Sequence, residues 1–506
     1  MHPYSNFTNE ISKEVLFNSL VGCGLFADKI PKFLNSKEFL KYISKIDLPM
    51  DIKPEDYIRY STMRNTNFPR PLAIPAPFSY ANLCWSLKSN WKKLKKHFEE
   101  TTKNEKHKVS RIHLRKMKDR CELFQMNYKN YNTDGFPDQE LLIKSKYVVT
   151  ADIAKCFPTI YSHSIPWSLI GRKEAKKKKN PTEWFNKLDF YIRNSKYGET
   201  NGLQIGPHTS NLISEIVLTK VDSELVKQGF KYTRHIDDYS CYCKTYAESE
   251  QFLLKLSEEL RKYELSLNEK KSEIIPLPKA SVKKWVNQIN HFIFVNTYKV
   301  GSKEAILTKD LKGFMDFVIE LMLDSGSDAA VLNYAIKIIA NKHLDSNAKH
   351  YFKQHIHHLV LLYPYLANLL DEFVFVAHKM KKKEIKSIAN DLYEYGIESN
   401  VFEACSHALF WAMKYDFKIE HQNSKENSIK SMDCIFMLTS YLYNRKNNKK
   451  AFLKEFQELA KELKKFDFDR YWLFVYTVLP WSDQPHNYKQ MKKDKVSFIN
   501  KEYQYK

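Results

Sequence analysis

The chain has 506 residues and is strongly basic, with 81 lysines and arginines against 59 acidic residues and a formal charge of +22. This length allows several domains with substantial cores, and the charge favours a polyanionic partner over an acidic or neutral one. Residues 1–300 hold 50 of the basic and 33 of the acidic residues, so the polyanion is expected to bind the N-terminal part.

Secretion and membrane insertion are not expected. No basic segment followed by an apolar block opens the chain, and the longest apolar run, 471–481, is shorter than the ~20 residues that a spanning helix requires. The eight cysteines form no CxxC pair, which fits a reduced compartment and argues against a zinc knuckle. We therefore expect a soluble, cytoplasmic protein that does not contact a membrane.

Residues 1–300 mix two kinds of pattern. The segments 146–153 and 232–236 are rich in Tyr, Val, Thr and Ile and predict strands, whereas the apolar residues of 251–262 recur at helical spacing. The alternation predicts an α+β domain over 1–300.

After about residue 300 the strand signal fades and amphipathic helical windows follow one another, which predicts an all-α domain over 301–506. Pairs of such helices with short polar links favour a stacked helical array of the HEAT type, and an irregular helical bundle remains the alternative. The expected helices are 304–324, 328–343, 348–369, 383–396, 400–416, 428–445, 449–465 and 470–479.

The stretch KYTRHIDDYSCYCKT, residues 231–245, places two acids between two strand-like runs. It predicts a β-hairpin with Asp237 and Asp238 at its tip, since Asp tolerates the positive φ that tight hairpin turns demand. Adjacent carboxylates repel each other unless a cation binds them. An ordinary Asp-rich turn is the alternative interpretation.

A second acid supports the functional interpretation. In KYVVTADIAKCFPTI a buried-looking strand runs directly into Asp152, which can supply a carboxylate, followed by Ile153, which can supply a backbone carbonyl. If this strand lies beside the hairpin, Asp152, Asp237 and Asp238 converge on a pair of Mg²⁺ or Mn²⁺ ions ~3.5 to 4 Å apart. Such a site is typical of nucleotidyl transfer.

These blocks resemble those of the reverse transcriptase family. ADIAKCFPTI is similar to its first catalytic block, with Phe157 in the place of the bulky gate beneath the nucleotide sugar, and HIDDY is similar to its tyrosine-x-Asp-Asp block, with His235 where the tyrosine usually stands. NGLQIGPHTSNLISEIVL resembles the glycine block, with Gln204 in place of the usual proline and Gly206 as its second glycine. The resemblance implies that Gln204 and Gly206 contact the incoming nucleotide.

Two more blocks extend the resemblance. LSLNEKKSEI is similar to the block that places a lysine, here Lys271, near the leaving pyrophosphate, and FPRPLAIP is similar to the fingers block whose arginine, here Arg70, binds the triphosphate. The family resemblance implies a fingers and palm domain and a divalent-metal enzyme that uses dNTPs.

A reverse transcriptase palm followed by a helical array resembles the abortive-infection group of bacterial phage-defence polymerases, a group with prophage-encoded members. That resemblance implies template-independent DNA synthesis primed by a protein hydroxyl, DNA that stays covalently attached, and a homo-oligomer. Among 31 tyrosines no single primer can be chosen, and the candidates considered near the termini are Tyr4, Tyr42, Tyr503 and Tyr505.

Two basic stretches are candidate nucleic-acid contacts. Residues 106–120 space Lys108, Arg111, Arg115 and Lys118 at helical intervals, which predicts one basic face. Residues 172–180, RKEAKKKKN, are the weaker candidate, because a solvated charged helix explains such a run more simply.

Two alternatives to template-independent synthesis stay open. One is a conventional RNA-templated reverse transcriptase that works with a noncoding RNA, and the other is a catalytically dormant palm that serves as a nucleic-acid-binding or phage-sensing scaffold. The three acids speak against dormancy, because a scaffold has no need of mutually repelling carboxylates.

Overall fold

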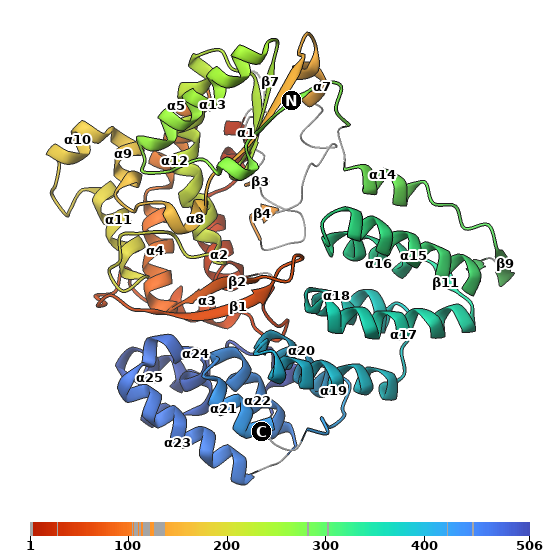
Figure 1. The fold of residues 1–506 in the computed structure, drawn as a ribbon. Helices are drawn as coiled ribbons and strands as arrows, with labels where there is room; N and C mark the ends of the chain where they lie inside the picture. Colours follow the sequence, from red (N-terminus) through yellow and green to blue (C-terminus); the bar gives the residue numbers. More distant parts are fainter. Residues whose placement is uncertain are drawn as a thin grey trace.

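A four-stranded antiparallel sheet in the middle of the chain carries the acidic residues singled out above (Figure 1). The strands, in the order β6-β7-β5-β8, are β5 (Tyr147–Asp152), β6 (Tyr232–His235), β7 (Asp238–Cys243) and β8 (Glu273–Pro276). The strands predicted at 146–153 and 232–236 are therefore confirmed. The computed structural model describes residues 4–27, 29–103, 105, 110, 113–114, 122–125, 137–280, 283–300, 303–421, 424–447 and 450–505.

Helices cover this sheet because its inward side chains are apolar. Helix α13 (Tyr246–Arg261) packs on β5 and β7 through a stripe that includes Phe252, Leu256 and Leu260, all buried. Thr245 caps its N-terminus by accepting a hydrogen bond from the backbone of Glu248. The long helix α12 (His208–Lys227) lies behind α13 and is buried along most of its length.

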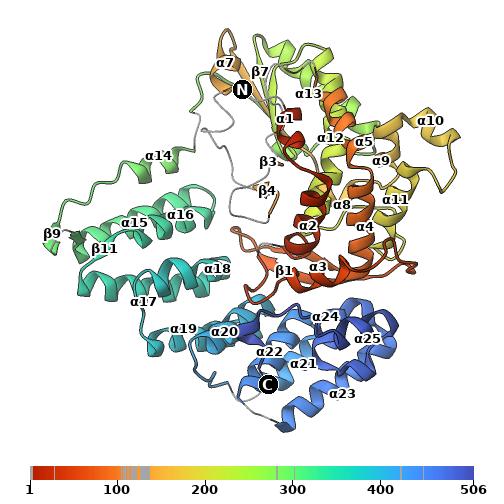
Figure 2. The ribbon, with the colours of Figure 1, turned by 180° about the vertical axis from the view of Figure 1, so that it is seen from behind.

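The N-terminal part adds helices and a second, two-stranded sheet. Strands β1 (Tyr57–Met63) and β2 (Pro69–Pro75) form an antiparallel pair, and the view from behind shows helix α2 (Lys13–Cys23) beside helix α4 (Pro77–Ser89) (Figure 2). Further elements of residues 1–300 are α1 (Tyr4–Asn9), α3 (Lys37–Ile43), α5 (Trp91–Thr102), β3 (His113–Leu114), β4 (Phe124–Gln125), α7 (Pro137–Leu142), α8 (Cys156–Thr159), α9 (Ser164–Ile170), α10 (Arg172–Lys177), α11 (Trp184–Asn194), η1 (Glu269–Lys271), α14 (Lys284–Asn290) and β9 (Thr297–Val300).

The C-terminal half is mostly helical, as expected. Its helices are α15 (Thr308–Asp324), α16 (Ala330–Ala340), α17 (Ser346–Leu362), η2 (Pro364–Leu366), α18 (Ala367–Leu370), the π-helical η3 (Asp371–Val376), α19 (Lys382–Glu398), α20 (Phe402–Lys414), α21 (Ser424–Ser431), α22 (Cys434–Lys446), α23 (Lys450–Phe466), α24 (Phe468–Val478), η4 (Trp481–Asp483), α25 (His486–Lys493) and η5 (Lys501–Tyr503). The HEAT-like arrangement stays a prediction.

The expectation of an all-α second domain was wrong at its start. Strands β10 (Lys303–Ile306) and β11 (His343–Leu344) join β9 in a three-stranded sheet of order β11-β10-β9. Ala305 and Ile306 are buried in this sheet, whereas the helical pattern that predicted 304–324 begins in fact at Thr308. The error arose because strands of two to four residues are too short for the alternation of apolar and polar residues to be distinguished from the start of a helix.

The helical half packs directly on the β1–β2 pair. Helices α20, α22 and α24 contact β1, and the Glu403 carboxylate accepts a hydrogen bond of 2.7 Å from the backbone N–H of Met63. Buried apolar residues from both halves form one continuous cluster. The fingers-like strands are thus held from below by the second half of the chain (Figure 1). Among the described residues, no helix combines the length and apolarity needed to cross a membrane.

Candidate active site

The structure brings Asp152, Asp237 and Asp238 together. Asp152 ends β5 and pairs in register with Asp238, which begins β7, while Asp237 lies in the turn between β6 and β7. One carboxylate oxygen from each of the three residues lies within 4.8 Å of the others. Asp152 is buried, at 6 % exposed, and the other two are more open to solvent. Residues 85 positions apart therefore form one acidic cluster.

Burial and the neighbouring carboxylates raise the pKa values of Asp237 and Asp238. Burial and the charges of its two neighbours raise the pKa of Asp238 from 3.8 to about 6. Burial, followed by the Asp152 charge, likewise raises the pKa of Asp237. Hard cations such as Mg²⁺ prefer oxygen ligands of this kind, so the donor set fits a divalent metal.

Lys271 is the nearest counter-charge. It ends η1, and its Nζ lies 2.6 Å from Asp152 Oδ2, a hydrogen bond that raises the pKa of the lysine. Asn268 also donates to the same carboxylate oxygen, at 3.2 Å, and its backbone N–H donates to the Asp152 carbonyl at 2.7 Å. One ammonium group for three carboxylates leaves the cluster acidic.

Ile153 and Arg70 lie around the cluster. The backbone N–H of Ile153 donates to the carbonyl of Asp237 at 3.2 Å, which ties the end of β5 to the turn between β6 and β7. Arg70 stands on β2 opposite Thr62, and its positive charge opposes the rise in the pKa of Asp237. The β1–β2 pair thus brings one positive charge near enough to act on Asp237.

Phe157 lies in α8, just beyond the cluster, with its side chain partly exposed. The backbone N–H of Leu203 donates to the Phe157 carbonyl at 2.6 Å, so the glycine block is joined directly to this helix. Gly202 has φ +78°, and a Cβ there would lie 2.5 Å from the carbonyl oxygen of Pro158. Only glycine fits this junction.

Gln204 and Gly206 are engaged with the protein itself. Gln204 is buried and its Nε2 donates to the carbonyl of Ser195 at 2.7 Å. Gly206 has φ +126°, and a Cβ there would approach the Ala73 carbonyl on β2 to 3.1 Å. These contacts explain both residues by their roles in the fold. Their contact with a nucleotide stays a prediction.

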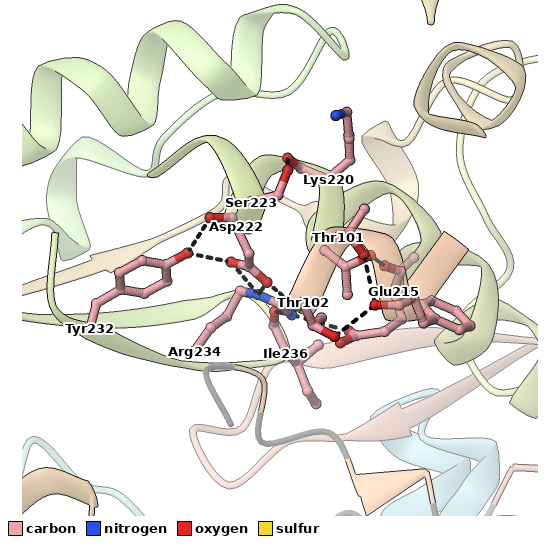
Figure 3. Close-up of polar contacts among 12 residues, drawn as sticks. Thr101, Thr102, Glu215, Lys220, Asp222, Ser223, Tyr232, Arg234 and Ile236 are labelled. Atoms are coloured by element: carbon pink, nitrogen blue, oxygen red, sulfur yellow. Dashed lines mark hydrogen bonds and ion pairs between the residues drawn. The ribbon is translucent and has the colours of Figure 1, made fainter. Parts of the chain in front are cut away.

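A network of buried charged side chains lies next to the turn between β6 and β7 (Figure 3). The sequence analysis did not predict this network. Arg234 is fully buried, and its guanidinium donates to Asp222 and Glu215, at 2.6 and 3.0 Å from Nη2. The Tyr232 hydroxyl also donates to Asp222. Nη1 of Arg234 donates to the carbonyl of Ile236 at 2.8 Å, so the network reaches the residue before Asp237.

The turn itself differs from the prediction. Ile236, and not an aspartate, takes the positive φ, at +57°, which is strained for a β-branched side chain. The hydrogen bond from Arg234 to its carbonyl helps to hold this conformation. The available sequence signal was the pair Glu215 and Asp222, seven residues apart on one face of an apolar helix, where buried acids need a buried cation.

The candidate priming tyrosines are less free than expected. Tyr503 is 6 % exposed and packs against Phe33 and Phe410, with ring centroids 6.2 and 5.5 Å away, so it is not on a mobile end. Tyr42 lies within α3, and Tyr505 is half-buried, which raises its pKa to about 12. The side chain of Tyr4 lies outside the described residues.

The two basic stretches have different outcomes. Lys108, Arg111, Arg115 and Lys118 lie outside the described residues. In 172–180, helix α10 is largely exposed, and its Arg172 stands over the Trp167 ring at 4.2 Å and pairs with Glu264 at 3.1 Å. The simpler interpretation, a solvated charged helix, suits these contacts.

Comparison with known proteins bears on residues 87–291, which match the family model described as reverse transcriptase (RNA-dependent DNA polymerase). This segment contains β5, the turn between β6 and β7, the glycine block and Lys271. No match was found among curated proteins.

Solved structures of telomerase are weakly similar. Apo telomerase from Candida tropicalis, truncated from its C-terminal domain, is 14% identical with a TM-score of 0.32, over 54% of this chain and 57% of that one. Telomerase from Candida albicans in complex with a TWJ fragment of telomeric RNA is 11% identical with a TM-score of 0.29, over 74% and 67%. The chain thus spans little more than half of the truncated telomerase.

The family match and the acidic cluster coincide in one segment of the chain. The earlier resemblance to reverse transcriptases is confirmed for that segment. Residues 87–291 match the reverse transcriptase family model and contain the three clustered acids, which supports an enzyme of the nucleotidyltransferase class.

Proposed function

We propose that the chain is a Mg²⁺-dependent DNA polymerase that builds DNA from dNTPs without a template and starts from a hydroxyl group of the protein. The observation that carries the catalytic part is the cluster of three carboxylates within 4.8 Å, two of them with raised pKa values. Such a cluster costs stability unless cations bind it, which a functional metal site explains.

Each residue has a defined part in this proposal. Bound divalent ions would stabilise charge on the attacking and leaving oxygens. Asp152, Asp237 and Asp238 supply the ligands, with the Ile153 carbonyl as a further oxygen. Arg70 binds the triphosphate by paired hydrogen bonds.

Two other side chains act on the sugar and the leaving group. Phe157 excludes the 2′-hydroxyl of a ribonucleotide by its bulk. Lys271 keeps its proton, since its pKa is raised, and would transfer its contact from Asp152 to the departing pyrophosphate. A DNA 3′-hydroxyl and a tyrosine hydroxyl are both oxygen nucleophiles that a bound divalent ion would activate by favouring the ionised form.

Protein priming, covalent attachment of the DNA, assembly into a homo-oligomer and a role in abortive-infection defence rest on the resemblance of the domain order to that group. The departures at Gln204 and His235 from the usual blocks support a site that differs from template-copying members. The cytoplasm is the compartment that supplies dNTPs and Mg²⁺ for this reaction.

The decisive experiment incubates the purified chain with Mg²⁺ and labelled dNTPs and adds no nucleic acid. We expect label to stay on the protein band after denaturation. The Asp237→Asn/Asp238→Asn variant is the matched control and should carry no label. Label found only in free product, or only when a template is added, would contradict protein priming.

One observation favours a second candidate, an RNA-templated reverse transcriptase: the matching family model describes RNA-dependent DNA polymerases. Supplying an RNA template with an annealed primer and sequencing the product separates the two. A product complementary to the RNA would support the second candidate, and a product of unrelated sequence would support the first.

A further inference from the structure

A hollow of about 590 Å³ opens in the helical half, outside the reverse transcriptase domain. It lies where α16 ends, β11 follows and α17 begins, and the turn after η3 closes its other side. Its charged and titratable lining consists of Lys342, His343, Lys349, His378 and Lys379. Among the described residues that line it there is no carboxylate.

The floor of the hollow is a buried histidine without a partner. His378 is 4 % exposed, and its Nε2 makes no hydrogen bond. The ring packs edge-on against Phe352, with centroids 5.1 Å apart. Burial, and then the positive charges of Lys349 and Lys353, lower the pKa of His378 to about 4, so the ring stays neutral.

The lysines around it lack a carboxylate in direct contact among the described residues, although Glu384 acts on Lys349 from a distance and the Lys342 ammonium stands 5.9 Å from the centre of the Phe294 ring. Lys349 is partly buried and forms no ion pair with the residues that the structure describes, and burial followed by the neighbouring Lys353 lowers its pKa. Lys342 and Lys379 are exposed, and neither forms an ion pair with a described residue. The like charges converge on one concave surface, where they repel one another.

The nearest acids are already occupied. Glu384 binds Lys353 at 2.9 Å and accepts a hydrogen bond of 2.7 Å from the backbone of Lys381. Asp345 caps α17 by accepting a hydrogen bond from the backbone N–H of Ala348. Lysines on an exposed, convex surface are solvated and need no ligand. Here the lysines line a hollow above the buried His378 ring, and no described acid in the lining neutralises them, so an anion from outside the chain would stabilise the hollow.

We propose that this hollow is a binding site for a phosphate-bearing anion, with the ammonium groups of Lys342, Lys349 and Lys379 as its main contacts. Lysine binds phosphate as a mobile point charge with several donors. The volume lies in the range of pockets that hold small ligands and accommodates a nucleotide. The same phosphate chemistry is available from a free nucleotide or from a nucleic-acid backbone.

The test uses the full-length chain and isothermal titration calorimetry with three probes: inorganic phosphate, ATP and single-stranded dT12. EDTA is present, and the titrations are repeated with Arg70→Ala, so that binding at the acidic cluster does not contribute. The Lys342→Ala/Lys379→Ala variant removes two exposed lysines from the hollow. The matched control, Lys309→Ala/Lys312→Ala, removes the same charge from exposed positions of α15 outside it.

We expect at least one probe to bind the wild type and to bind the hollow variant at least tenfold more weakly, with the control within twofold. Hydrogen exchange should slow on binding in residues 340–349. Binding of phosphate and ATP would identify a free nucleotide or phosphate as the source, and binding of dT12 alone would identify a nucleic-acid backbone. Equal affinity in the two variants, or no binding of any probe, would overturn the proposal.

Discussion

Two acidic groups stand on opposite sides of one hairpin turn, and they differ in their counter-charges. Glu215 and Asp222 are each 1 % exposed, and both bind the guanidinium of Arg234. Asp152, Asp237 and Asp238 lie close together, Asp238 is exposed, and the ion pair of this cluster among the described residues is the one between Lys271 and Asp152. Buried charges that are all paired hold the local conformation, whereas a cluster of acids with few counter-charges indicates a ligand site.

The inner group, Glu215 and Asp222 with Arg234, supports the turn that carries part of the outer group, Asp152, Asp237 and Asp238. Burial alone would lower the pKa of Arg234, but Asp222 and Glu215 raise it, so the guanidinium stays charged. A charged Arg234 donates to the Ile236 carbonyl and supports the turn that carries Asp237. The three acids around Lys271 are therefore expected to bind a ligand, whereas Arg234 is expected to position the turn that carries Asp237.

The largest expected effect comes from neutralising the outer group. The Asp237→Asn/Asp238→Asn variant should lose nucleotide incorporation below detection, because the metal ligands are removed. Without metal, carboxylates with raised pKa values cost stability as the pH rises from about 4 to about 6. The melting temperature at pH 7 should therefore stay equal or increase. Remaining incorporation would refute the ligand assignment.

Removing the inner cation should affect folding. Arg234→Leu leaves two buried acids unpaired and should cost about 3–5 kcal/mol of unfolding free energy. Urea denaturation measures this loss. Arg172→Leu, at an exposed ion pair with Glu264, is the control and should change stability by no more than about 1 kcal/mol. Equal losses in both variants would contradict the contrast between buried and exposed pairs.

The positioning role needs a milder change. Arg234→Lys keeps the charge but cannot reach both acids and the Ile236 carbonyl, so kcat should fall about tenfold while KM for dNTP changes little. Ile236→Gly accepts the positive φ without strain. Adding it to Arg234→Lys should restore part of kcat, measured by steady-state incorporation. If the double variant is as slow as Arg234→Lys, the turn is not what Arg234 positions.

The outer group should also show a pH-dependent metal affinity. As the pH falls through about 6, Asp238 gains a proton that a divalent ion must displace. The affinity for Mg²⁺ should thus decrease by about threefold between pH 6.5 and 5.5, and stay nearly constant between 7.5 and 8.5. Calorimetric Mg²⁺ titrations of the full chain check this, and a constant affinity across pH 5.5–7.5 would count against Asp238 as a ligand.

The smallest effect concerns the sugar gate. Phe157→Ala should leave dNTP incorporation within about threefold and increase the use of ribonucleotides, because the bulk beneath the sugar is removed. Parallel kcat/KM measurements for dATP and ATP give the ratio. Phe185→Ala is no suitable control because Phe185 is buried, whereas Phe190→Ala changes an exposed ring on α11. An unchanged ratio would remove Phe157 from the gate.

Sequence patterns predicted those strands and helices that are determined by residues close together in the chain. The strands of the hairpin and β5 were evident because their β-branched and aromatic runs end at the acids. Strands β10 and β11 were missed, because such short strands depend on pairing partners distant in the chain. The burial of Tyr503 was missed for a similar reason, since its neighbours Phe33 and Phe410 come from remote segments.

The amino-acid order alone determined which chemistry is available: three acids at strand ends, blocks in the order of a reverse transcriptase, and a basic N-terminal half. Tertiary structure alone decided which charges meet. The pairing of Arg234 with Glu215 and Asp222, the positive φ at Ile236 and the convergence of lysines over His378 all depend on contacts between separate segments. Electrostatic energy depends on distance in space and on burial, and neither quantity is present in a linear pattern.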